Sequence, residues 1–599
     1  MVQDSKLTPF YKFGKIQKMV QRRRIDMVKL ERYLRPYWGF ILLTTFIKLL
    51  GTITELFIPY LMEVMVDIKV PQGDRPAIFL YGGLMLLCAA LALSFNILAN
   101  RMAAQSAGRI TKTIRHDLFA KLQSLSAKQM DQLTVSSAVS RLTSDTYNIN
   151  QLLARFQRMG IRAPMLLIGG VVLMLSMDAK LALILIGLLP IIAIVAYLVT
   201  KYSVPMHFHQ QDVLDDMVRT VQENITGVRV IKALSKSDYE KKRFHGVNRD
   251  LSDITMKAGA VTGITNPVAS LVLNLGLTLA VVVGAYRVNA GQMESGVIVA
   301  FLQYFTYILN AMLGITRIFV MWSKGEASAK RVANVLAEPE DLAVLLAEEA
   351  PENAPHIEFR NVAFSYTGVG KNVENLSFKL EHGQTLGILG ATGSGKSTIV
   401  NLLLRLYDPD EGQILIDGQD IRTIPTEKLR AKFGVVFQND FVTEGTVADN
   451  IRFFRELSDD ALHRAAQDAQ AAEFIEERAG GIDAEVVVRG NNLSGGQKQR
   501  LLIARALAAN PEILVLDDAS SALDYQTDSK LRAALRKNYR NTTTVLIAQR
   551  ISSLRHADLI LVLEDGGILG AGSHETLLDS CEEYRMIAHT QMGDGKEGA

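Results

Sequence analysis

Six long apolar segments occupy the first half of the chain, and they constrain its fold more than any other feature. A helix needs about 20 apolar residues to cross the hydrocarbon core of a bilayer, and most of these segments reach that length. They cover roughly residues 37–64, 77–99, 163–177, 181–200, 268–286 and 297–321. The third segment is short, so we expect its helix to extend backward past Arg162. Buried helices of a soluble core are the alternative interpretation, but such length repeated six times with few charges favours membrane spans.

The second half of the chain has a different texture. Although the whole sequence is 48% hydrophobic and 21% charged, the long apolar runs end near residue 325. An alternation of strand-like and helix-like segments starts at His356, which is typical of an α/β domain. A charged, alanine-rich stretch with three prolines lies between the two regions. It indicates the end of a long helix followed by a linker.

Basic residues are distributed unevenly among the connections between the apolar segments. They cluster before the first segment, between the second and third, and between the fourth and fifth, for example at Arg22, Arg115 and Lys241. Because positively charged connections stay on the cytoplasmic side, both termini are expected inside the cell. The long inside connections also show helical periodicity, as at Leu118 and Leu122. We expect their helices to run well past the bilayer, which would let the intervening turns touch the second domain.

Global features exclude several other classes of protein. The net charge is only +3, so nothing in the overall charge indicates a nucleic-acid partner. The two cysteines, Cys88 and Cys581, suggest neither a disulfide framework nor a cysteine metal cluster. A long polar leader precedes the first apolar segment, which makes that segment a poor signal peptide.

Few polar residues interrupt the apolar segments. The clearest are Lys48, Glu55, Asn96, Asn274 and Asn310. An ionisable group inside a membrane is by default a functional hypothesis, so these residues are candidates for lining a substrate route. The asparagines have a simpler alternative role, since amide side chains also join membrane helices by hydrogen bonds.

One glycine-rich stretch, Gly390–Thr398, fits the pattern G-x-x-x-x-G-K-[ST] between a strand-like and a helix-like run. Glycines let backbone N–H groups turn toward one concavity, and the start of the helix adds partial positive charge. Lys396 can reach the β- and γ-phosphates of a nucleotide, and Ser397 can bind Mg²⁺. The stretch therefore predicts a nucleotide site. Its expected contact residues are Gly390, Thr392, Gly393, Ser394, Gly395, Lys396, Ser397 and Thr398.

Three further stretches suit the same site. The apolar run before Asp517 indicates a strand, and an aspartate at a strand end beside the phosphate loop can hold Mg²⁺. Leu493–Gln497 is a second glycine turn before a helical run, and its backbone amides would suit a terminal phosphate. Thr544–Gln549 indicates another buried strand that ends in a polar side chain. Each of these stretches therefore offers further candidate contacts for phosphate or Mg²⁺.

In this order the motifs resemble those of the ATP-binding cassette (ABC) transporter family. With the six preceding segments, roughly residues 20–590 resemble a half-transporter of the exporter type. The resemblance implies that the bound nucleotide is ATP with Mg²⁺. It assigns Tyr366 to the aromatic residue that stacks on adenine and Gln438 to the Q-loop glutamine near Mg²⁺. The expected Mg²⁺ ligands are Ser397, Gln438 and Asp517.

The same resemblance implies further landmarks and a domain plan. Ser521–Asp524 matches the D-loop, and two coupling helices are expected near residues 127–133 and 210–216. The expected fold class is an α-helical membrane domain with six spans, followed by an α/β P-loop nucleotide-binding domain. The expected parts are a cytoplasmic N-terminal segment (1–35), the transmembrane domain with long cytoplasmic helical extensions (36–325), a linker (326–355), the ATP-binding cassette domain (356–590) and a tail (591–599).

The sequence departs from the family at the hydrolytic centre. Asp518 stands where most members have the glutamate that activates the attacking water, and its side chain is one methylene shorter. Gln549 stands in place of the switch histidine, and glutamine can neither titrate nor carry a positive charge. Both changes predict that this site hydrolyses ATP weakly. The alternative is a slow but competent site in which Asp518 acts as the base. A third departure lies at Glu485–Gly490, where Val487 and Val488 replace a glycine and a second glutamate. It puts the usual signalling contact with the coupling helices in doubt.

The signature turn, by contrast, is intact at Ser494, Gly495, Gly496 and Gln497. In this family ATP lies between the phosphate loop of one nucleotide domain and the signature of another, so the chain must pair. The resemblance therefore implies a second half-transporter, non-identical, that supplies the consensus glutamate and histidine and receives this signature. The predicted function is ATP-driven export of amphipathic, drug-like small molecules across a bacterial plasma membrane.

Two other functions stay open at this point. A homodimeric exporter of lipids, peptides or drugs with slow ATPase would need no different partner. A soluble ABC protein acting on DNA or ribosomes would share the signature turn, but it would have no reason for six membrane spans.

Overall fold

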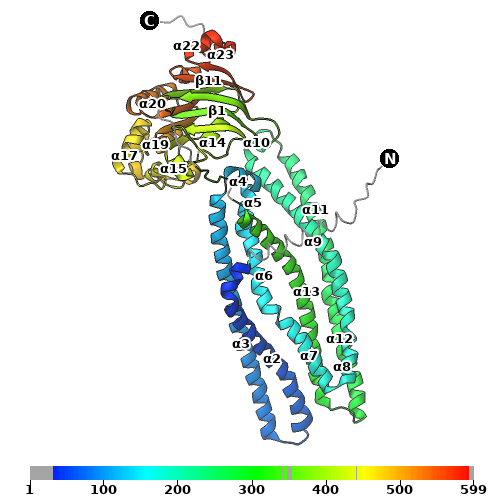
Figure 1. The fold of residues 1–599 in the computed structure, drawn as a ribbon. Coiled ribbons are helices and arrows are strands. Elements are labelled where there is room, and N and C mark those ends of the chain that lie inside the picture. The colour runs from blue at the N-terminus through cyan, green and yellow to red at the C-terminus, as the bar shows by residue number, and fades with distance from the viewer. Residues whose placement is uncertain (1–30, 340–341, 347–353, 440, 593–599) are drawn as a thin grey trace, which may run out of the picture. The chain divides into compact units, whose positions relative to one another are not determined.

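The computed structural model describes residues 31–339, 342–346, 354–439 and 441–592, and the chain forms two compact units (Figure 1). Of the described residues, the first unit comprises those up to Gln123 together with Val135–Glu338. The second comprises Ser124–Thr134 and the described residues from Pro339 onward. The basic N-terminal cluster, part of the linker and the tail from residue 593 lie outside the described residues, so the expectations for them stay predictions.

The first unit consists of long helices. Six helical spans within the described residues are long and apolar enough to cross a membrane, as predicted. They are Glu31–Lys69, Arg75–Ser124, Val135–Met177, Ala179–Thr226, Ser237–Asn289 and Ser295–Ile315. The second span is a single helix of 50 residues, α3 (Arg75–Ser124), which would be roughly 75 Å long at 1.5 Å per residue. That length far exceeds the thickness of a bilayer.

Several spans contain breaks at residues that disfavour a continuous helix. The short third segment is α7 (Arg162–Met177), and it is separated from α6 (Thr146–Met159) by a turn at Gly160 and Ile161. A second break separates α8 (Ala179–Ile186) from α9 (Leu189–Thr226), whose first turn contains a proline. The other helices are α2 (Trp38–Val64), α5 (Val135–Ser140), α10 (Val228–Ala233), α11 (Ser237–Gly263), α12 (Thr265–Asn289) and α13 (Ser295–Ala337), with short η1 (Arg35–Tyr37), η2 (Met65–Lys69) and η3 (Arg141–Asp145).

Helix α13 provides the centre of the apolar core of this unit. Its Phe301, Tyr304 and Phe305 are completely buried. The Tyr304 hydroxyl donates a hydrogen bond of 2.8 Å to the carbonyl oxygen of Leu56, which joins α13 to α2. On α12, a Cβ at Gly276 would lie 2.1 Å from the Phe305 ring, so only glycine permits this close approach. Large side chains on α13 and small residues on its neighbours thus set the helix packing.

The polar residues of the spans are mostly paired with each other or with their own helix. Lys48 Nζ of α2 donates to Asn96 Oδ1 at 2.6 Å and to Asn100 Oδ1 at 3.2 Å, both on α3. Arg162 of α7 donates to both carboxylate oxygens of Glu55, at 2.8 and 3.1 Å. Asn274 and Asn310 each donate to a carbonyl of the preceding turn of their own helix. Lys48 and Asn96 therefore connect two helices.

The second unit contains two main sheets and a small one. An antiparallel sheet has the order β2-β1-β4-β5, and a mainly parallel sheet has the order β12-β11-β3-β10-β9-β6, with β12 antiparallel to β11. Parallel strands buried on both faces read as unbroken apolar runs, and β9 (Ile513–Asp517) is buried at every position. This explains why its sequence lacks the alternation of a half-exposed strand. The expected α/β fold is confirmed.

Helices cover the parallel sheet on both sides and connect its strands (Figure 1). One apolar core joins the two sheets through α14, and another lies between β9 and the helices α16 to α19. The strands are β1 (Ile357–Phe364), β2 (Val373–Leu380), β3 (Thr385–Gly390), β4 (Glu411–Ile416), β5 (Gln419–Asp420), β6 (Phe433–Val436), β7 (Gly445–Thr446), β8 (Glu485–Val486), β9, β10 (Thr543–Ile547), β11 (Leu559–Glu564) and β12 (Gly567–Gly572). The helices are α14 (Lys396–Leu403), α15 (Thr426–Ala431), α16 (Val447–Arg452), α17 (Asp459–Asp468), α18 (Ala472–Glu476), α19 (Gly495–Leu507), α20 (Tyr525–Asn538), α21 (Ile551–Leu554), α22 (His574–Ser580) and α23 (Glu582–Met592), with η4 (Gly481–Asp483) and η5 (Val488–Gly490).

A short helix from the first half of the chain also belongs to this second unit. It is α4 (Ala127–Leu133), which has the bounds expected for the first coupling helix. Its Asp131 carboxylate accepts a hydrogen bond from the Tyr407 hydroxyl, and its Gln129 amide donates to the carbonyl of Pro339 at 2.6 Å. A capping box at Ser126 fixes where the helix starts.

The expected second coupling helix, near residues 210–216, is wrong in its position. Those residues lie in the middle of α9, which continues without interruption to Thr226. The helix ends at Gly227, and the short helix that follows is α10. The stretch 210–216 contains neither glycine nor proline, so nothing in it stops the helix.

Candidate functional site

The glycine-rich loop leads from the end of β3 into the start of α14, as the sequence pattern predicts. Gly395, the residue before α14, has φ 97°, a left-handed conformation that glycine adopts without strain. A Cβ at this position would lie 2.7 Å from the carbonyl oxygen of Asn372. Gly393 is also left-handed, with φ 87°. Sharp turns at these glycines bring the chain round so that the N-terminus of α14 faces the loop.

The cation and the hydroxyl of this loop are positioned by specific contacts. Lys396 Nζ donates to the carbonyl oxygens of Gly390 at 2.8 Å and Ala391 at 2.7 Å, so the ammonium lies over the loop. Ser397 Oγ donates to Asp517 Oδ2 at 2.8 Å, which brings together two of the predicted Mg²⁺ ligands. Burial raises the pKa of Asp517, whose residue is only 4% exposed, although the Ser397 hydrogen bond opposes the shift.

These groups fit Mg²⁺ and a phosphate chain. A serine hydroxyl and a carboxylate are the hard oxygen ligands that Mg²⁺ prefers. Burial lowers the pKa of Lys396, while Asp517 and Asp518 oppose that shift. Ser394 Oγ is buried and has no hydrogen-bond partner within the described part of the chain. The Ser394 hydroxyl can therefore donate a hydrogen bond to an anionic ligand in the loop.

Asp518 and Gln549, the two residues that differ from the family's glutamate and histidine, contact each other. Gln549 Nε2 donates to Asp518 Oδ2 at 3.3 Å. The contact arises because β9 and β10 are neighbours in the parallel sheet, with Asp517 paired with Ile547, and both side chains follow these strand ends. Burial raises the pKa of the Asp518 carboxyl, and the nearby Lys396 and Arg550 oppose the shift. The carboxylate at the position of the catalytic glutamate therefore already receives an amide hydrogen bond.

The predicted adenine-stacking residue lies beside α14. Tyr366 packs edge-on against Phe364 and Tyr407, and its hydroxyl accepts a hydrogen bond of 2.9 Å from Asn401 Nδ2. It is 38% exposed, so part of its ring is available to a base. Gln438 is exposed in the turn after β6, and the hydrogen bonds of the described residues do not bring it to Ser397 or Asp517. Two of the three predicted Mg²⁺ ligands are thus adjacent, and the assignment of Gln438 as the third stays a prediction.

The signature turn forms the N-terminus of α19. Ser494 is the N-cap: its Oγ accepts from the Gln497 amide at 3.3 Å, while Gln497 Oε1 accepts from the Ser494 amide at 2.9 Å. This capping box keeps the turn rigid and leaves the helix N-terminus with its partial positive charge. At Gly496, a Cβ would lie 3.1 Å from the Ala522 carbonyl, so the turn packs closely on the D-loop.

Gln499 is a residue of this region that the motif analysis does not single out. Its Nε2 donates to Ser521 Oγ at 3.1 Å, and its Oε1 accepts from the Ala522 amide at 2.9 Å. The side chain thereby ties the signature helix to the D-loop. One feature of the sequence could have indicated this role. Gln499 lies in the first turns of the helix that follows Leu493–Gln497, where side chains point back toward the preceding turn.

The valines of the third departure are partly exposed. Val487 and Val488 are 37% and 56% exposed beside β8. Asn492 fixes this loop, because its Nδ2 donates to the Glu485 carbonyl at 2.8 Å and its Oδ1 accepts from the Val487 amide at 3.2 Å. The loop thus presents apolar side chains where the family's pattern has a glycine and a carboxylate.

Comparison with known proteins decides the family. The profile of the ABC transporter transmembrane region matches residues 41–312, and the ABC transporter profile matches residues 373–521. The uncharacterized ABC transporter ATP-binding protein YfiB of Bacillus subtilis is 34% identical over 578 residues, which cover 96% of this chain and 100% of the relative. An uncharacterized ABC transporter ATP-binding protein of Mycobacterium tuberculosis is 32% identical over 569 residues, 94% of this chain and 97% of its own length. The chain belongs to the ABC transporter family.

A solved structure gives the fold of the exporter. This ABC transporter matches a bacterial Atm1-family ABC exporter, solved with ATP bound, with a TM-score of 0.79 and 26% identity. The match covers 94% of this chain and 99% of the other. The chain is thus an exporter half-transporter: a membrane-spanning domain and an ATP-binding domain that couples ATPase activity to transport. Because it carries one half of an exporter, it works with a second half-transporter.

Proposed function

We propose that this exporter half is the subunit with the hydrolytically weak ATP site in a heterodimer, and that it exports amphipathic small molecules. The observation that carries the proposal is the contact between Gln549 and Asp518, 3.3 Å long, at the centre where the family places a glutamate and a histidine. An aspartate in this contact has both a shorter reach and an occupied oxygen. A misplacement of about 1 Å at a reacting centre can cost about a hundredfold in rate.

The phosphate loop nevertheless retains what binding requires. Lys396 lies over the loop, and Ser397 and Asp517 are 2.8 Å apart as a hydroxyl and a carboxylate suited to Mg²⁺. When bound, Mg²⁺ supplies positive charge that neutralises the phosphate oxygens. Tyr366 contributes a half-exposed ring for the adenine. This chain's own site therefore holds ATP and contributes to closing the two nucleotide domains.

The catalytic contribution of the chain runs through its signature turn. Ser494 and Gln497 keep the turn closed by their capping box, so the backbone amides of Gly495 and Gly496 are presented at a fixed helix N-terminus. In the dimer this turn faces the phosphate loop of the partner. The partner contributes the glutamate and the histidine, and hydrolysis at that composite site resets the exporter.

The substrate class follows from the membrane domain. Glu55 is paired with Arg162, and Lys48 is held by Asn96 and Asn100, so these groups serve helix packing and leave little charge to recognise an ionic cargo. An amphipathic, drug-like compound needs mainly apolar surface. The relatives named above come from bacteria, which supports a bacterial plasma membrane. The positive connections support cytoplasmic termini.

Restoration of the consensus residues in this chain tests the proposal. The purified chain alone should hydrolyse ATP slowly, and the double variant Asp518→Glu, Gln549→His should be faster by about tenfold or more, because two such chains would then supply complete sites to each other. The control is the same double variant with Ser494→Arg, which should remain slow. Robust, vanadate-sensitive ATPase activity of the unmodified chain alone would instead support a homodimer.

A further inference from the structure

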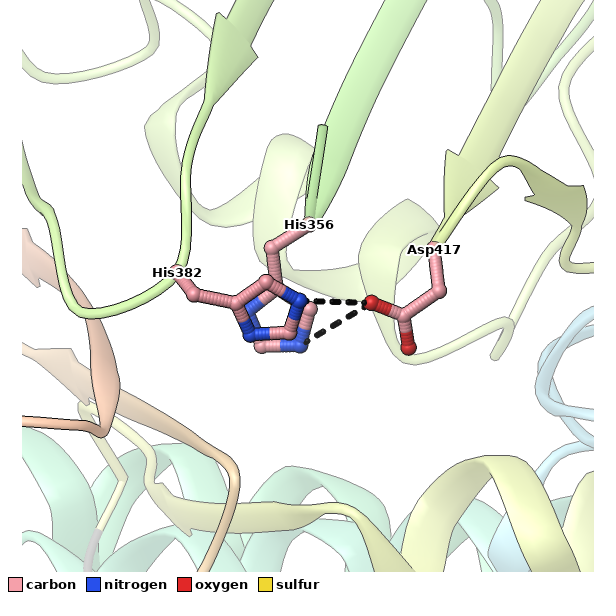
Figure 2. Close-up of side chains that lie close together, drawn as sticks. All are labelled: His356, His382 and Asp417. Carbon is pink, nitrogen blue, oxygen red and sulfur yellow. Dashed lines mark ion pairs between the residues drawn. The ribbon is translucent and has the colours of Figure 1, made fainter. Parts of the chain in front are cut away.

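Three side chains that the nucleotide site does not use lie together in the second unit: His356, His382 and Asp417 (Figure 2). They come from three loops: the residue before β1, the β2–β3 turn and the β4–β5 turn. His382 lies just before β3, whereas the phosphate loop follows the other end of that strand. Six residues of β3 separate the two places, roughly 20 Å along the strand. The cluster is therefore not part of the ATP site.

The most informative member is His356, which is only 1% exposed. Its Nδ1 lies 2.6 Å from Thr543 Oγ1, but its Nε2 is buried without a hydrogen-bond partner in the described structure. The nearest carboxylate oxygen, Asp417 Oδ1, is 3.9 Å away, too far for a hydrogen bond. A buried polar atom without a hydrogen-bond partner lowers the stability of the folded state, and a ligand bound to Nε2 would remove that penalty.

The surrounding contacts arrange the other two groups toward the same point. His382 Nε2 lies 3.0 Å from Asp417 Oδ1, and the other carboxylate oxygen, Oδ2, lies 3.3 Å from Lys432 Nζ. Lys432 is also paired with Glu512, which offsets its charge. Asp417 is left-handed, with φ 49°, and its amide donates to the His356 carbonyl at 3.0 Å, so the turn presents its carboxylate in a fixed direction.

We propose that His356 Nε2, His382 Nε2 and Asp417 Oδ1 form a site for a Zn²⁺-class metal ion, with water as the fourth ligand. Two imidazoles and one carboxylate are a common zinc ligand set, and two nitrogen ligands disfavour Mg²⁺ and Ca²⁺. Thr543 is the outer partner that orients the metal-binding ring, since it can accept a hydrogen bond from Nδ1–H and leave the Nε2 lone pair free.

Binding requires one local movement. The three ligand atoms lie within 4.8 Å of one another, whereas bonds of about 2.0–2.2 Å in a tetrahedron need separations of about 3.3–3.5 Å. The two rings are stacked, with centroids 3.9 Å apart and planes 13° from parallel. An ion lies in the plane of each ring that binds it, so the planes must converge. The side chain of His382 is 63% exposed, so its ring can turn toward solvent once it leaves the stack, whereas His356 is enclosed.

Burial also lowers the pKa of His356, with Asp417 opposing the shift. A neutral imidazole is the form that binds metals. The ion would connect the loop before β1 with turns of both neighbouring strands, where the antiparallel sheet meets the parallel sheet. Because His356 is among the first described residues after the linker, the site would hold the entry of the chain into the ATP-binding domain.

Cobalt binding to the full-length chain, purified without a histidine tag and freed of metal and nucleotide, tests the site. Co²⁺ should bind with one ion per chain and give the visible absorption bands of a tetrahedral site, and Zn²⁺ should displace it. His382→Ala and Asp417→Asn should each weaken binding by about tenfold or more. The matched control is His463→Ala, an exposed histidine of α17, which should change nothing.

Thermal unfolding supplies the second readout. Zn²⁺ should raise the melting temperature of the unmodified chain and of His463→Ala but not that of His382→Ala, because an ion that binds only the folded state stabilises it. His382 is exposed, so its replacement should leave the metal-free melting temperature unchanged. Absence of tetrahedral bands in the unmodified chain, or equal binding by His382→Ala, would overturn the proposal.

Discussion

In the proposed function, Asp518 is the residue that limits the chemistry of this site. Its backbone is left-handed, with φ 53°, a conformation that aspartate tolerates better than most residues. Its amide donates to the Ile547 carbonyl at 3.1 Å, so β10 holds that conformation. With the backbone fixed, the direction of the Cα–Cβ bond is fixed too, and only side-chain rotation can move the carboxylate. The missing methylene of aspartate therefore cannot be recovered by a local shift of the chain.

Gly395 is the residue on which the phosphate loop depends most directly. Gly395→Ala would place a Cβ 2.7 Å from a carbonyl oxygen at φ 97°, so we expect nucleotide binding by this chain to fall about tenfold or more. A fluorescent ATP analogue titrated against the isolated chain measures the effect. The control, Gly481→Ala, is also left-handed but has open space around it, and it should bind normally. Equal affinities of the two variants would contradict this prediction.

Some residues of the candidate sites could be predicted from the sequence and others could not. The phosphate loop could be predicted because its residues are contiguous, and the contact of Ser397 with Asp517 follows from adjacent strands. The cluster of His356, His382 and Asp417 could not be predicted, since its members are distant in the chain and meet only through the sheet topology. Nor does the sequence indicate that Gln549 turns toward the aspartate beside it rather than toward solvent.

Among the secondary-structure elements, α4 has the most informative contact. This short helix comes from the membrane half of the chain but packs within the nucleotide unit, where Asp131 accepts a hydrogen bond from Tyr407. Tyr407 in turn packs against Tyr366, the predicted adenine-stacking residue. A change at the nucleotide could therefore be transmitted to α4 through two side chains, Tyr366 and Tyr407.

Removal of the Tyr407 hydroxyl tests this path. A hydrogen bond to a charged group contributes about 1.5–3 kcal/mol, and Tyr407→Phe removes it while keeping the buried ring. We expect basal ATP binding to be kept and the stimulation of ATPase by transported substrate to fall severalfold in the assembled exporter. The matched control is Tyr539→Phe, which removes a similar tyrosine–aspartate hydrogen bond, of 3.1 Å to Asp468, away from α4. A similar loss of stimulation in both variants would argue against the path.

The helices also show where sequence reasoning fails. Apolar length predicts the spans, because backbone hydrogen bonding leaves few alternatives in a bilayer. The place where one long helix turns into the next has a weaker signal. The position predicted for the second coupling helix is wrong because α9 continues through polar, helix-forming residues to Thr226. The helix ends only at Gly227. The turn before α9 is marked more clearly, since a proline lies in its first turn.

For the membrane domain as a whole, partly buried ion pairs hold helices of different spans together. The side chain of Glu55 is 17% exposed and that of its partner Arg162 is 40% exposed. Glu55→Gln keeps the shape but leaves the arginine without its carboxylate. Removing one partner of a buried pair costs about 3–5 kcal/mol, and the exposure of Arg162 reduces this to roughly 1–3 kcal/mol. Thermal unfolding in detergent should show the loss.

The control for that variant is Glu223→Gln, which breaks an ion pair with Arg243 whose carboxylate is 49% exposed, against 17% for Glu55. Exposed pairs contribute about 0–1 kcal/mol, so its melting temperature should hardly change. Should Glu55→Gln be as stable as this control, the pair would have no structural role, and Glu55 would again be a candidate for substrate contact.

At the scale of the assembled exporter, the proposed function assigns this chain's contribution to hydrolysis to its signature turn and not to its own phosphate-loop site. The decisive measurement is the ATPase rate of the heterodimer carrying one variant at a time in this chain. Ser494→Arg should reduce the rate by about a hundredfold, because it disrupts the helix N-terminus that faces the partner's ATP in the proposed heterodimer. Asp518→Asn should change the rate less than about threefold, since the proposed function assigns little hydrolysis to that site. Equal losses from the two variants would contradict this assignment.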